Sequence, residues 1–443
     1  MPKLKLHWQI LIAIVLAVIA GSLTGKEASI FGVTFFSIYD FFGTLFMNAL
    51  KMVIVPLIVA SIITGIASIG GGQGLGRLGG KTILFYMSTS LMAILVGLVL
   101  VNTIAPGIVD GEPIKDIIAV SDEQIQETES KVLGKEAGTL ADIFLRMVPT
   151  NIVTAAAEGQ MLGLIFFSIL FGLFISKISE AYAEAQYNFW QGLYEVMLKI
   201  TELIIKFAPI GVFALIAEVV AGFEGQSENI ARAAEALTKF SMTVVLALGV
   251  HIFVTLPLML RFIAGVNPIR HFKAMMPALL TAFSTASSSA TLPLTLECVE
   301  KNAKVSNRTS SFVLPLGATV NMDGTALYEC VVAIFIFQAF GFELSFTEQF
   351  LIVFTALMTS IGVAGIPAAS LIAIMVILKQ VGLPEAQASA GLAMVLIVDR
   401  VLDMSRTAAN VFSDSCGAVI IGKSEGETQI LADDEASPAR KSV

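Results

Sequence analysis

Charged side chains recur at helical spacing in an otherwise apolar stretch near the C-terminus, 395-VLIVDRVLDMSRTAANVFSDSCGAVII-421. With about 100° of rotation per residue, Asp399, Asp403 and Arg406 fall within roughly 60° of one another on a helix. The same stripe, about 100° wide, also contains Thr407, Asn410 and Asp414. An ionised group in hydrocarbon costs at least about 2.5–3.5 kcal/mol. We therefore expect this stripe to face protein or a water-filled cavity and to bind a polar solute there. Arg400 lies outside the stripe and is interpreted as a structural pair.

The composition is that of a polytopic membrane protein. Of the 443 residues, 56% are hydrophobic and 14% are charged, and the mean hydropathy is +0.84. A soluble domain has about 45–50% apolar and about 25% charged residues. The net charge of −8 argues against a nucleic-acid partner.

Histidine and cysteine give no sign of catalytic or metal chemistry. The three cysteines are isolated, with no metal-ligand spacing and no disulfide framework. The three histidines, His7, His251 and His271, are scattered, and we interpret them as ordinary core or interface residues. Serines are plentiful, but no base is placed to activate one. The sequence therefore does not predict an enzyme.

The first half of the chain reads as a series of membrane helices. The basic start and the apolar run after it resemble a signal peptide, but the many later spans favour a first helix whose Lys3 and Lys5 lie inside the cell. Further helices are predicted at about 40–70, 81–105, 188–221 and 231–262. The stretch at 141–178, interrupted by Pro149 and AAAEGQ, is predicted to be a broken or multi-segment helix. The glycine-rich stretch between the second and third helices lacks a phosphate-loop ending and is interpreted as a cytoplasmic loop. Residues 107–138, with eight acidic side chains, are interpreted as an extracellular loop.

After residue 273, short apolar arms alternate with helices that have polar centres. Residues 275–299 are interrupted by STASSS and Pro293, and residues 350–378 by a Gly/Pro/Ser tip. Each arm is too short to cross about 30 Å of hydrocarbon, so both segments are predicted to be re-entrant hairpins. The helix between them, 311–338, contains NMDGT at its centre.

The order of these segments is hairpin, polar-centred helix, hairpin, polar-centred helix. Because the number of crossings between the hairpins is odd, the two units are inverted relative to each other. Repeated interrupted segments in two halves indicate the midplane site of a secondary transporter. The alternative is a set of Pro-kinked helices in a channel or a membrane enzyme.

Four stretches, TASSSATLP, LPLGATVNMDGTALYE, SIGVAGIP and DRVLDMSRTAANVFSD, resemble the glutamate/aspartate transporter family, also called dicarboxylate/amino acid:cation symporters. The likeness is strongest over 275–421, and LKMVIVPLI extends it to the N-terminal half. The resemblance implies an all-α membrane protein of eight transmembrane helices plus two re-entrant hairpins, forming inverted repeats. It further implies a homotrimer in the cell (inner) membrane, with both termini cytoplasmic and an elevator-type mechanism.

The resemblance also implies a division of the chain into a fixed scaffold and a moving transport domain, with the second hairpin as the outer gate. The expected parts are scaffold helices one and two at 1–80, helix three of the transport domain at 81–106, the acidic loop at 107–138, scaffold helices four and five at 139–225, the rest of the transport domain at 226–422, and a cytoplasmic tail at 423–443.

The stripe can be interpreted beside this resemblance as a site for a dicarboxylic amino acid. Arg406 suits the side-chain carboxylate, because a guanidinium binds carboxylate through two hydrogen bonds. Asp403 offers a counter-charge to the ammonium group. Main-chain amides at the hairpin tips would hold the α-carboxylate, aided by helix dipoles. The remaining expected substrate contacts are Ser287, Ser288, Thr325, Gly365, Ile366, Thr407 and Asn410.

The resemblance implies three Na⁺ sites built from oxygen ligands. One would use Gly317, Asn321, Asn410 and Asp414. A second would use Thr319, Ser360, Ile361 and Val363. A third would use Tyr86, Thr89, Ser90 and Asp323, with Asn321.

Three departures from the family pattern bear on coupling. Glu329 stands where animal members carry a glutamate associated with proton coupling, which leaves H⁺ co-transport open. The arginine that other members place beside the site is absent at Ala286 and Met404, which puts K⁺ counter-transport in doubt. Ser370 replaces a glycine after the second hairpin tip, so the shape of the gate could differ.

The leading interpretation is Na⁺-coupled symport of L-glutamate or L-aspartate across a lipid bilayer. The alternatives are an H⁺-coupled or C4-dicarboxylate symporter of the same family and an ion channel lined by the charged stripe.

Overall fold

The computed structural model describes residues 6–67, 75–115, 145, 147–158, 160–222, 227–360 and 370–431, and these are mostly helical. The N-terminal helices are α1 (Leu6–Thr24), α2 (Phe35–Ala67), α3 (Leu75–Ile104), α6 (Ile152–Glu158), α7 (Met161–Ile175), α8 (Glu180–Lys206) and α9 (Ala208–Gly222). The C-terminal helices are α10 (Ser227–Val250), α11 (Leu256–Phe262), α12 (Pro268–Thr285), α13 (Ser288–Glu297), α14 (Asn307–Val320), α15 (Asp323–Ala339), α16 (Phe346–Ser360), α17 (Ser370–Val381) and α18 (Glu385–Ser424). Two short hairpins pair β1 (Ser29–Ile30) with β2 (Val33–Thr34) and β3 (Ile108–Val109) with β4 (Glu112–Pro113).

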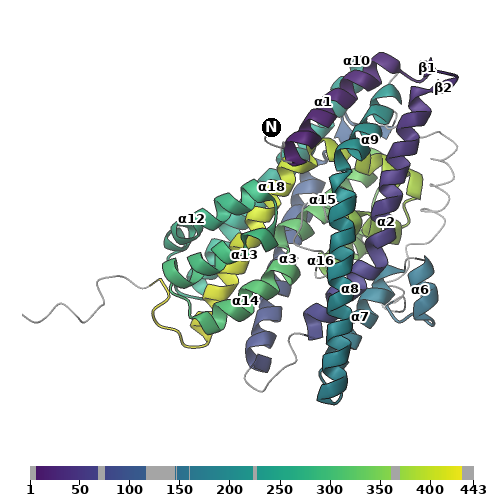
Figure 1. Ribbon diagram of the computed structural model, residues 1–443. Helices are drawn as coiled ribbons and strands as arrows, with labels where there is room; N and C mark the ends of the chain where they lie inside the picture. The colour runs from purple at the N-terminus through teal and green to yellow at the C-terminus, as the bar shows by residue number, and fades with distance from the viewer. Residues whose placement is uncertain are drawn as a thin grey trace, which may run out of the picture.

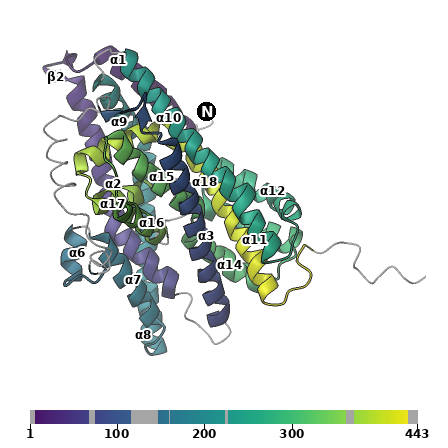
Figure 2. The same cartoon turned by 180° about the vertical axis from the view of Figure 1, so that it is seen from behind.

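The helices pack in two groups. In the first, α1 packs along α9, and α2 packs against α7, α8 and α9. In the second, α18 packs against α12, α14 and α15, while α3 packs against α10 and α15. Figures 1 and 2 show α12, α14 and α18 on one side of the molecule and α2, α7 and α8 on the other. Long-range contacts within each group thus bring together segments that are far apart in the chain.

Apolar length identifies the spans that could cross a bilayer. By length and composition alone, three helical stretches of the described chain qualify: Arg77–Ile104, Ala231–Phe262 and Asn307–Ala339. A fourth is added if α8 and α9, which meet at a 56° bend, are one span. Large apolar side chains are exposed on α1 (Val15 and Ile19) and on α10 (Met242 and Val245). Such outward-facing apolar surfaces suit contact with lipid or with another membrane-embedded surface.

The helix interruptions expected from the sequence are present. At AAAEGQ, α6 ends at Glu158 and α7 begins at Met161, and α14 and α15 are separated by Asn321 and Met322. The first hairpin consists of α12 and α13, which pack against each other. Its tip is tight, since Ala286 adopts φ +50° at the end of α12. The second hairpin consists of α16 and α17, also in contact, but its tip at 361–369 lies outside the described residues.

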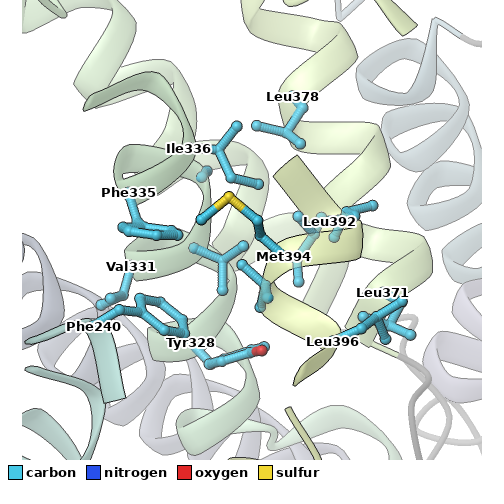
Figure 3. Packing of buried hydrophobic residues seen from close by; sticks show 14 of the residues in the cluster. Phe240, Tyr328, Val331, Phe335, Ile336, Leu371, Leu378, Leu392, Met394 and Leu396 are labelled. Carbon is cyan, nitrogen blue, oxygen red and sulfur yellow. The ribbon is translucent and has the colours of Figure 1, made fainter. Parts of the chain in front are cut away.

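An apolar core lies between α10, α15, α17 and α18 (Figure 3). The rings of Phe240 and Phe335 have centroids 4.7 Å apart, and Tyr328 lies beside Phe240. Within α15, every residue from Asp323 to Phe337 is buried. This helix is therefore enclosed by protein, as a helix with acidic residues in a membrane should be.

Two predicted boundaries differ from the structure. Helix α3 begins at Leu75 rather than at 81, so Arg77 and Lys81 lie on its first turns and not in a loop. The predicted tail from 423 includes a docked segment, because Ile430 is buried and the Leu431 amide donates to the Ala303 carbonyl oxygen. Residues 116–138 of the acidic loop and 432–443 of the tail lie outside the described residues.

Glu425 ties this docked segment to the start of α3. Its carboxylate accepts hydrogen bonds from Arg77 Nη2 at 2.7 Å and from Lys81 Nζ at 2.6 Å. Two residues later, Glu427 accepts from the Ser306 amide and the Ser306 and Thr309 hydroxyls at the start of α14. The segment after α18 therefore joins α3, α14 and α18 at one end of the second helix group.

We expect Glu425→Gln to lower the melting temperature of the purified protein at pH 7 by about 2 °C, the scale of a surface ion pair. Hydrogen bonds from Arg77 and Lys81 lower the pKa of Glu425 from 4.5 to about 2. The stabilisation is therefore nearly complete above the unfolded-state pKa and is lost as the pH falls toward 2. The difference between the variant and the wild type should shrink from pH 5 to pH 3. Glu297→Gln, which removes one exposed pair with Lys301, is the control. Identical melting at pH 7 would refute this role.

Candidate functional site

The break between α14 and α15 creates a polar centre inside the helix bundle. Asn321 (φ −101°, ψ 82°) and Met322 (φ −110°, ψ 55°) leave helical geometry, so one helix ends and another begins in the interior. The last carbonyl groups of α14 and the first amides of α15 then lack intrahelical partners. One such amide, that of Gly324, donates to Asn410 Oδ1 of α18 at 2.8 Å.

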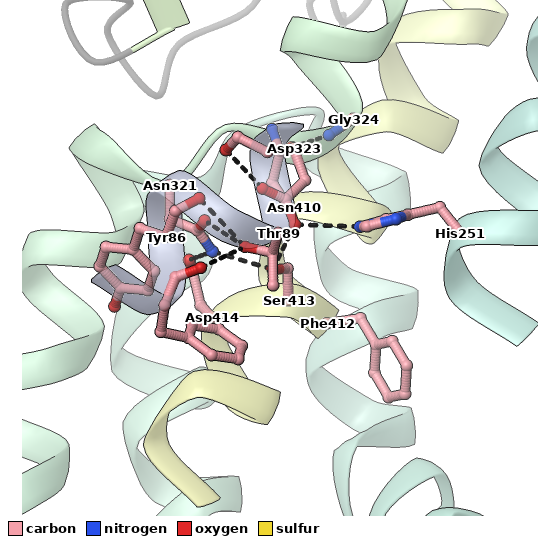
Figure 4. Close-up of polar contacts among 12 residues, drawn as sticks. Tyr86, Thr89, His251, Asn321, Asp323, Gly324, Asn410, Phe412, Ser413 and Asp414 are labelled. Carbon is pink, nitrogen blue, oxygen red and sulfur yellow. Dashed lines mark hydrogen bonds and ion pairs between the residues drawn. The ribbon is translucent and has the colours of Figure 1, made fainter. Parts of the chain in front are cut away.

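Asp323 lies at the middle of this polar centre and is fully buried (Figure 4). Ser90 Oγ donates to its Oδ1 at 2.6 Å, and Ser413 Oγ donates to its Oδ2 at 2.6 Å. His251 Nε2 lies 3.0 Å from the same Oδ2. Side chains from α3, α18 and the π-helical segment η2 (His251–Thr255) thus converge on one carboxylate.

Asp414, a second buried carboxylate, lies beside Asn321. The Asn321 amide donates to Asp414 Oδ1 at 2.9 Å and to Ser413 Oγ at 3.0 Å, and Thr89 Oγ1 lies 3.4 Å from Asn321 Oδ1. Gly317 packs so closely here that a Cβ would come within 2.5 Å of Asp414 Oδ1 and 2.7 Å of the Tyr86 hydroxyl. Only glycine fits at this position.

These residues suit a hard cation. Asp323 and Asp414 are held by hydroxyl, amide and imidazole groups, and an added cation would supply the positive charge that buried carboxylates need. The described residues contain no group of three histidine, cysteine, aspartate or glutamate side chains that could hold a metal ion. A cation here would therefore also need hydroxyl, amide and carbonyl oxygens, which the broken helix provides.

The structure brings together most of the first and third predicted Na⁺ sets. Thr89, Ser90, Asn321 and Asp323 are joined by hydrogen bonds, and Gly317 adjoins Asp414. The Tyr86 hydroxyl donates instead to the Val313 carbonyl oxygen at 2.7 Å. In the second predicted set, the Thr319 and Ser360 hydroxyls donate to the backbone carbonyls of Leu316 and Leu357, respectively. Its other members, Ile361 and Val363, lie outside the described residues.

Arg406 is the centre of a second polar cluster on α18. Its side chain is 1% exposed, and Nη2 donates to Asp403 Oδ1 at 2.8 Å and to Asp399 Oδ1 at 3.1 Å. The guanidinium carbon lies 3.7 Å from the centroid of the Tyr328 ring, a cation–π contact. Within the described part of the chain, its Nε and Nη1 have no hydrogen-bond partner. Nη2 is thus held by two aspartates, while Nε and Nη1 retain donors for a carboxylate.

Asp399 now has a defined place in this cluster. It accepts a hydrogen bond from the Tyr328 hydroxyl at 2.8 Å as well as from Arg406. It therefore holds both the guanidinium and the ring that stacks on it. Arg400 forms an ion pair with Asp403 Oδ2 at 3.5 Å, as the structural interpretation expected.

Asn410 of α18 contacts the residues at the break between α14 and α15. Its amide donates to Thr325 Oγ1 at 3.1 Å and contacts Met322 Sδ at 3.2 Å, while its carbonyl oxygen accepts from Gly324. Thr407, also on the predicted stripe, donates its hydroxyl to the Asp403 carbonyl oxygen at 2.8 Å. Of the predicted substrate residues, Thr325 and Asn410 are thus in direct contact, and Asp403, Arg406 and Thr407 lie on the adjoining turns of α18.

The first hairpin tip is preformed as a helix start. Ser287 caps α13, and its hydroxyl oxygen accepts from the Ala290 amide at 3.2 Å. Ser288 is buried as the first residue of α13, which packs against α18. An anion near this tip would meet a helix N-terminus. Gly365 and Ile366 of the second tip lie outside the described residues.

Glu329 is buried against the second hairpin. The Thr359 hydroxyl, on α16, donates to its Oε2 at 3.0 Å, and its Oε1 has no hydrogen-bond partner among the described residues. Ser370, the unusual residue of the gate, begins α17 and is 3% exposed. In the same described residues its hydroxyl has no partner. Both positions therefore retain hydrogen-bonding capacity beside the hairpin.

Three residues of the site escaped the sequence-based prediction. Ser413 falls near −40° on the α18 helical wheel, only about 20° beyond the edge of the stripe, so its position signalled a role. Tyr328 had no signal beyond its place after NMDGT. His251 was interpreted as an ordinary core or interface residue; it is fully buried, and its contact with Asp323 was not predicted.

Known proteins resemble this chain over almost its full length. The sequence profile of a family described as the sodium:dicarboxylate symporter family matches residues 6–424. The proton/glutamate-aspartate symporter of Escherichia coli (strain K12) is 35% identical over 424 residues, which covers 96% of this chain and 93% of that protein. The proton/sodium-glutamate symport protein of Geobacillus stearothermophilus is 35% identical over 427 residues, 96% of each chain. Excitatory amino acid transporter 1 of Ambystoma tigrinum is 33% identical over 454 residues, 92% of this chain and 81% of that one.

Proposed function

Because the chain belongs to the sodium:dicarboxylate symporter family, we propose that it is a secondary active transporter that carries L-glutamate or L-aspartate together with Na⁺. Transport of an acidic amino acid is supported by relatives named as glutamate, glutamate-aspartate and excitatory amino acid transporters. The Escherichia coli relative names the proton, and the Geobacillus stearothermophilus relative names both proton and sodium, so the cation is assigned from the site itself.

The observation that supports an acidic amino acid as the substrate is the guanidinium of Arg406, which is only partly hydrogen-bonded. A guanidinium whose Nε and Nη1 still have N–H groups to donate can bind a carboxylate through charge-assisted hydrogen bonds. Asp403, on the same face of α18, supplies the opposite charge for an ammonium group. The N-terminus of α13, capped by Ser287, suits the second carboxylate. One amino acid with two carboxylates would satisfy all three groups.

Coupling to Na⁺ is supported by the two buried carboxylates that adjoin the substrate residues. Asp323 and Asp414 are bridged through Ser413 and Asn321, and Asn410 connects this region to Thr325. A cation bound at the carboxylates would order Asn410 and so favour substrate binding. Thermodynamic linkage then requires that substrate also strengthen cation binding.

The two helix groups support an elevator mechanism. We assign α1, α2 and α6–α9 to a scaffold and α3 with α10–α18 to a moving transport domain, since packing is dense within each group. The protein would act as a homotrimer in the cell (inner) membrane with cytoplasmic termini. The second hairpin would form the outer gate, with the Ser370 hydroxyl beside it.

Reconstitution into liposomes tests the proposal. Uptake of labelled L-aspartate, L-glutamate and succinate would be measured with a Na⁺ gradient, with a pH gradient alone, and with neither. We expect saturable uptake of the two amino acids that follows the Na⁺ gradient. Uptake that is independent of Na⁺ and follows the pH gradient would assign H⁺, rather than Na⁺, as the coupled ion. A preference for succinate would overturn the role given to Asp403, and unsaturated ion flux would favour a channel.

Proton co-transport through Glu329 is the second candidate, since its carboxyl group is buried and bonded to Thr359 of the second hairpin. A proton on Glu329 would remove a buried charge beside this hairpin. We expect Glu329→Gln, which mimics the protonated form, to retain L-aspartate binding within about threefold, because burial of the neutral form costs little. Its uptake should lose the pH dependence of the wild type between pH 5 and 8.

Uptake at fixed Na⁺ across that pH range checks the assignment. The matched control is Thr359→Val, which keeps the carboxyl group and removes its hydroxyl partner. Uptake by Thr359→Val should still depend on pH, with its profile shifted along the pH axis. A Glu329→Gln variant with the wild-type pH profile would exclude Glu329 as the proton carrier.

A further inference from the structure

His251 occupies an irregular turn of the sixth predicted span. The α-helical pattern of α10 ends at Val250, and residues His251–Thr255 form a π-helical turn before α11. A π-turn inserted within a helix is uncommon and is frequently located at a functional site. The imidazole is fully buried, and Figure 4 shows it reaching from its own helix toward Asp323.

Three donors account for most of the hydrogen-bonding capacity of Asp323. An ionised carboxylate offers about four lone-pair positions. Ser90 occupies one on Oδ1, while Ser413 and His251 occupy two on Oδ2. These donors come from three different helices, so they define the plane of the carboxylate. The remaining lone pair lies on Oδ1, the oxygen bonded to Ser90 of α3.

We propose that His251 is a positioning residue for the cation site at Asp323. An ionised Asp323 can only accept hydrogen bonds, so His251 Nε2 must carry the hydrogen that it donates to Oδ2. This bond holds Oδ2 away from the ion and directs Oδ1 toward it. His251 itself does not bind the cation. The inference rests on the proposed function, because it assumes that Na⁺ binds at Asp323.

The second buried histidine provides an internal comparison. His271, on α12, is equally buried, and its Nε2 lies 2.9 Å from Ser415 Oγ of α18. Its ring also packs on Phe412. His271 therefore joins two helices in the way a structural histidine does, without contact to either buried carboxylate. A variant at His271 controls for the loss of a buried imidazole.

The experiment compares His251→Gln with His251→Asn in purified, substrate-free protein. The glutamine amide nitrogen can reach the place of Nε2, whereas the shorter asparagine cannot reach Oδ2. Na⁺ binding is measured as the rise in melting temperature during a NaCl titration, with choline chloride for ionic strength. L-aspartate affinity is measured separately at saturating Na⁺. Loss of a hydrogen bond that orients a metal ligand typically weakens metal binding about 10–100-fold.

We expect His251→Asn to raise the half-saturating Na⁺ concentration at least about tenfold, and His251→Gln to stay within about threefold of the wild type. The affinity for L-aspartate at saturating Na⁺ should be unchanged in both. His271→Gln should leave the Na⁺ titration unaltered. Equal half-saturating Na⁺ concentrations for the asparagine and glutamine variants would overturn this inference and leave the proposed function standing. A wild type that gives no response to Na⁺ would overturn the proposed cation, and this inference with it.

Discussion

Replacing Arg406 by cysteine is expected to abolish measurable binding of L-aspartate and L-glutamate. Truncation of one partner of a buried, hydrogen-bonded charge pair costs about 2–5 kcal/mol, which is roughly 30- to 5,000-fold in affinity. The variant also leaves Asp399 and Asp403 without the guanidinium that now contacts both. Neutral amino acids such as serine or cysteine should bind as well as before or better, because they need no cation for a side-chain carboxylate. Equilibrium binding of labelled amino acids to the purified variant measures both effects.

Arg400→Cys is the matched control for this variant. It removes the same side chain from the same helix, but Arg400 lies outside the stripe and contacts Asp403 at the longer distance of 3.5 Å. Its effect on L-aspartate affinity should be less than about tenfold, the range of a partly exposed ion pair. Unchanged L-aspartate affinity in Arg406→Cys would refute the carboxylate role. Equal losses in the two variants would show that the total charge of α18 matters more than the position of Arg406.

Replacing Asp323 by asparagine is expected to raise the Na⁺ requirement steeply. The substitution keeps the size of the side chain but removes the negative charge at the centre of the polar cluster. It also places an amide group opposite the donors from Ser90, Ser413 and His251, so one of them loses its acceptor. We expect the half-saturating Na⁺ concentration to rise by more than about tenfold, equivalent to about 1.4 kcal/mol.

Two measurements separate this effect from a general loss of folding. Melting temperature without substrate reports Na⁺ binding directly, and L-aspartate affinity at very high Na⁺ should recover toward the wild-type value. Asp399→Asn is the comparison, because it is also a buried carboxylate of the site but contacts Arg406 and Tyr328 rather than the cation residues. It should weaken L-aspartate binding and leave the Na⁺ response of the substrate-free protein unchanged. The same Na⁺ response in Asp323→Asn and wild type would exclude Asp323 as a ligand.

The architecture of the C-terminal half could be predicted because its signals are local. Short apolar arms around STASSS, and a polar break at Asn321 in an apolar helix, correspond to α12–α13 and to α14–α15. Each helix break is caused by the residues at that point, so it can be predicted from the local sequence. The start of α3 was placed six residues late, since glycines usually indicate a loop, whereas here Arg77 and Lys81 bind Glu425 and extend the helix.

The partners of the polar groups could not be predicted in the same way. The α18 wheel placed Asp399 on the stripe but did not reveal its role, because its partner Tyr328 lies 71 positions away in the chain. His251 and Asp323 are separated by 72 positions, and Ser90 and Asp323 by 233. No spacing rule connects residues that meet only when separate helices pack.

The sequence by itself determined that buried charge had to line one face of α18 and that two interrupted hairpins had to surround it. This follows from the hydrocarbon of the membrane, because backbone groups in it must be hydrogen-bonded, and charged groups paired, within the protein. Only the tertiary structure decided how the charges are shared. Packing bound Nη2 of Arg406 to two aspartates and left its Nε and Nη1 without a partner among the described residues. It also directed donors from α3, α18 and the π-turn at His251 onto a single carboxylate. Those choices depend on side-chain distances between helices, which are properties of the packed bundle rather than of any one segment.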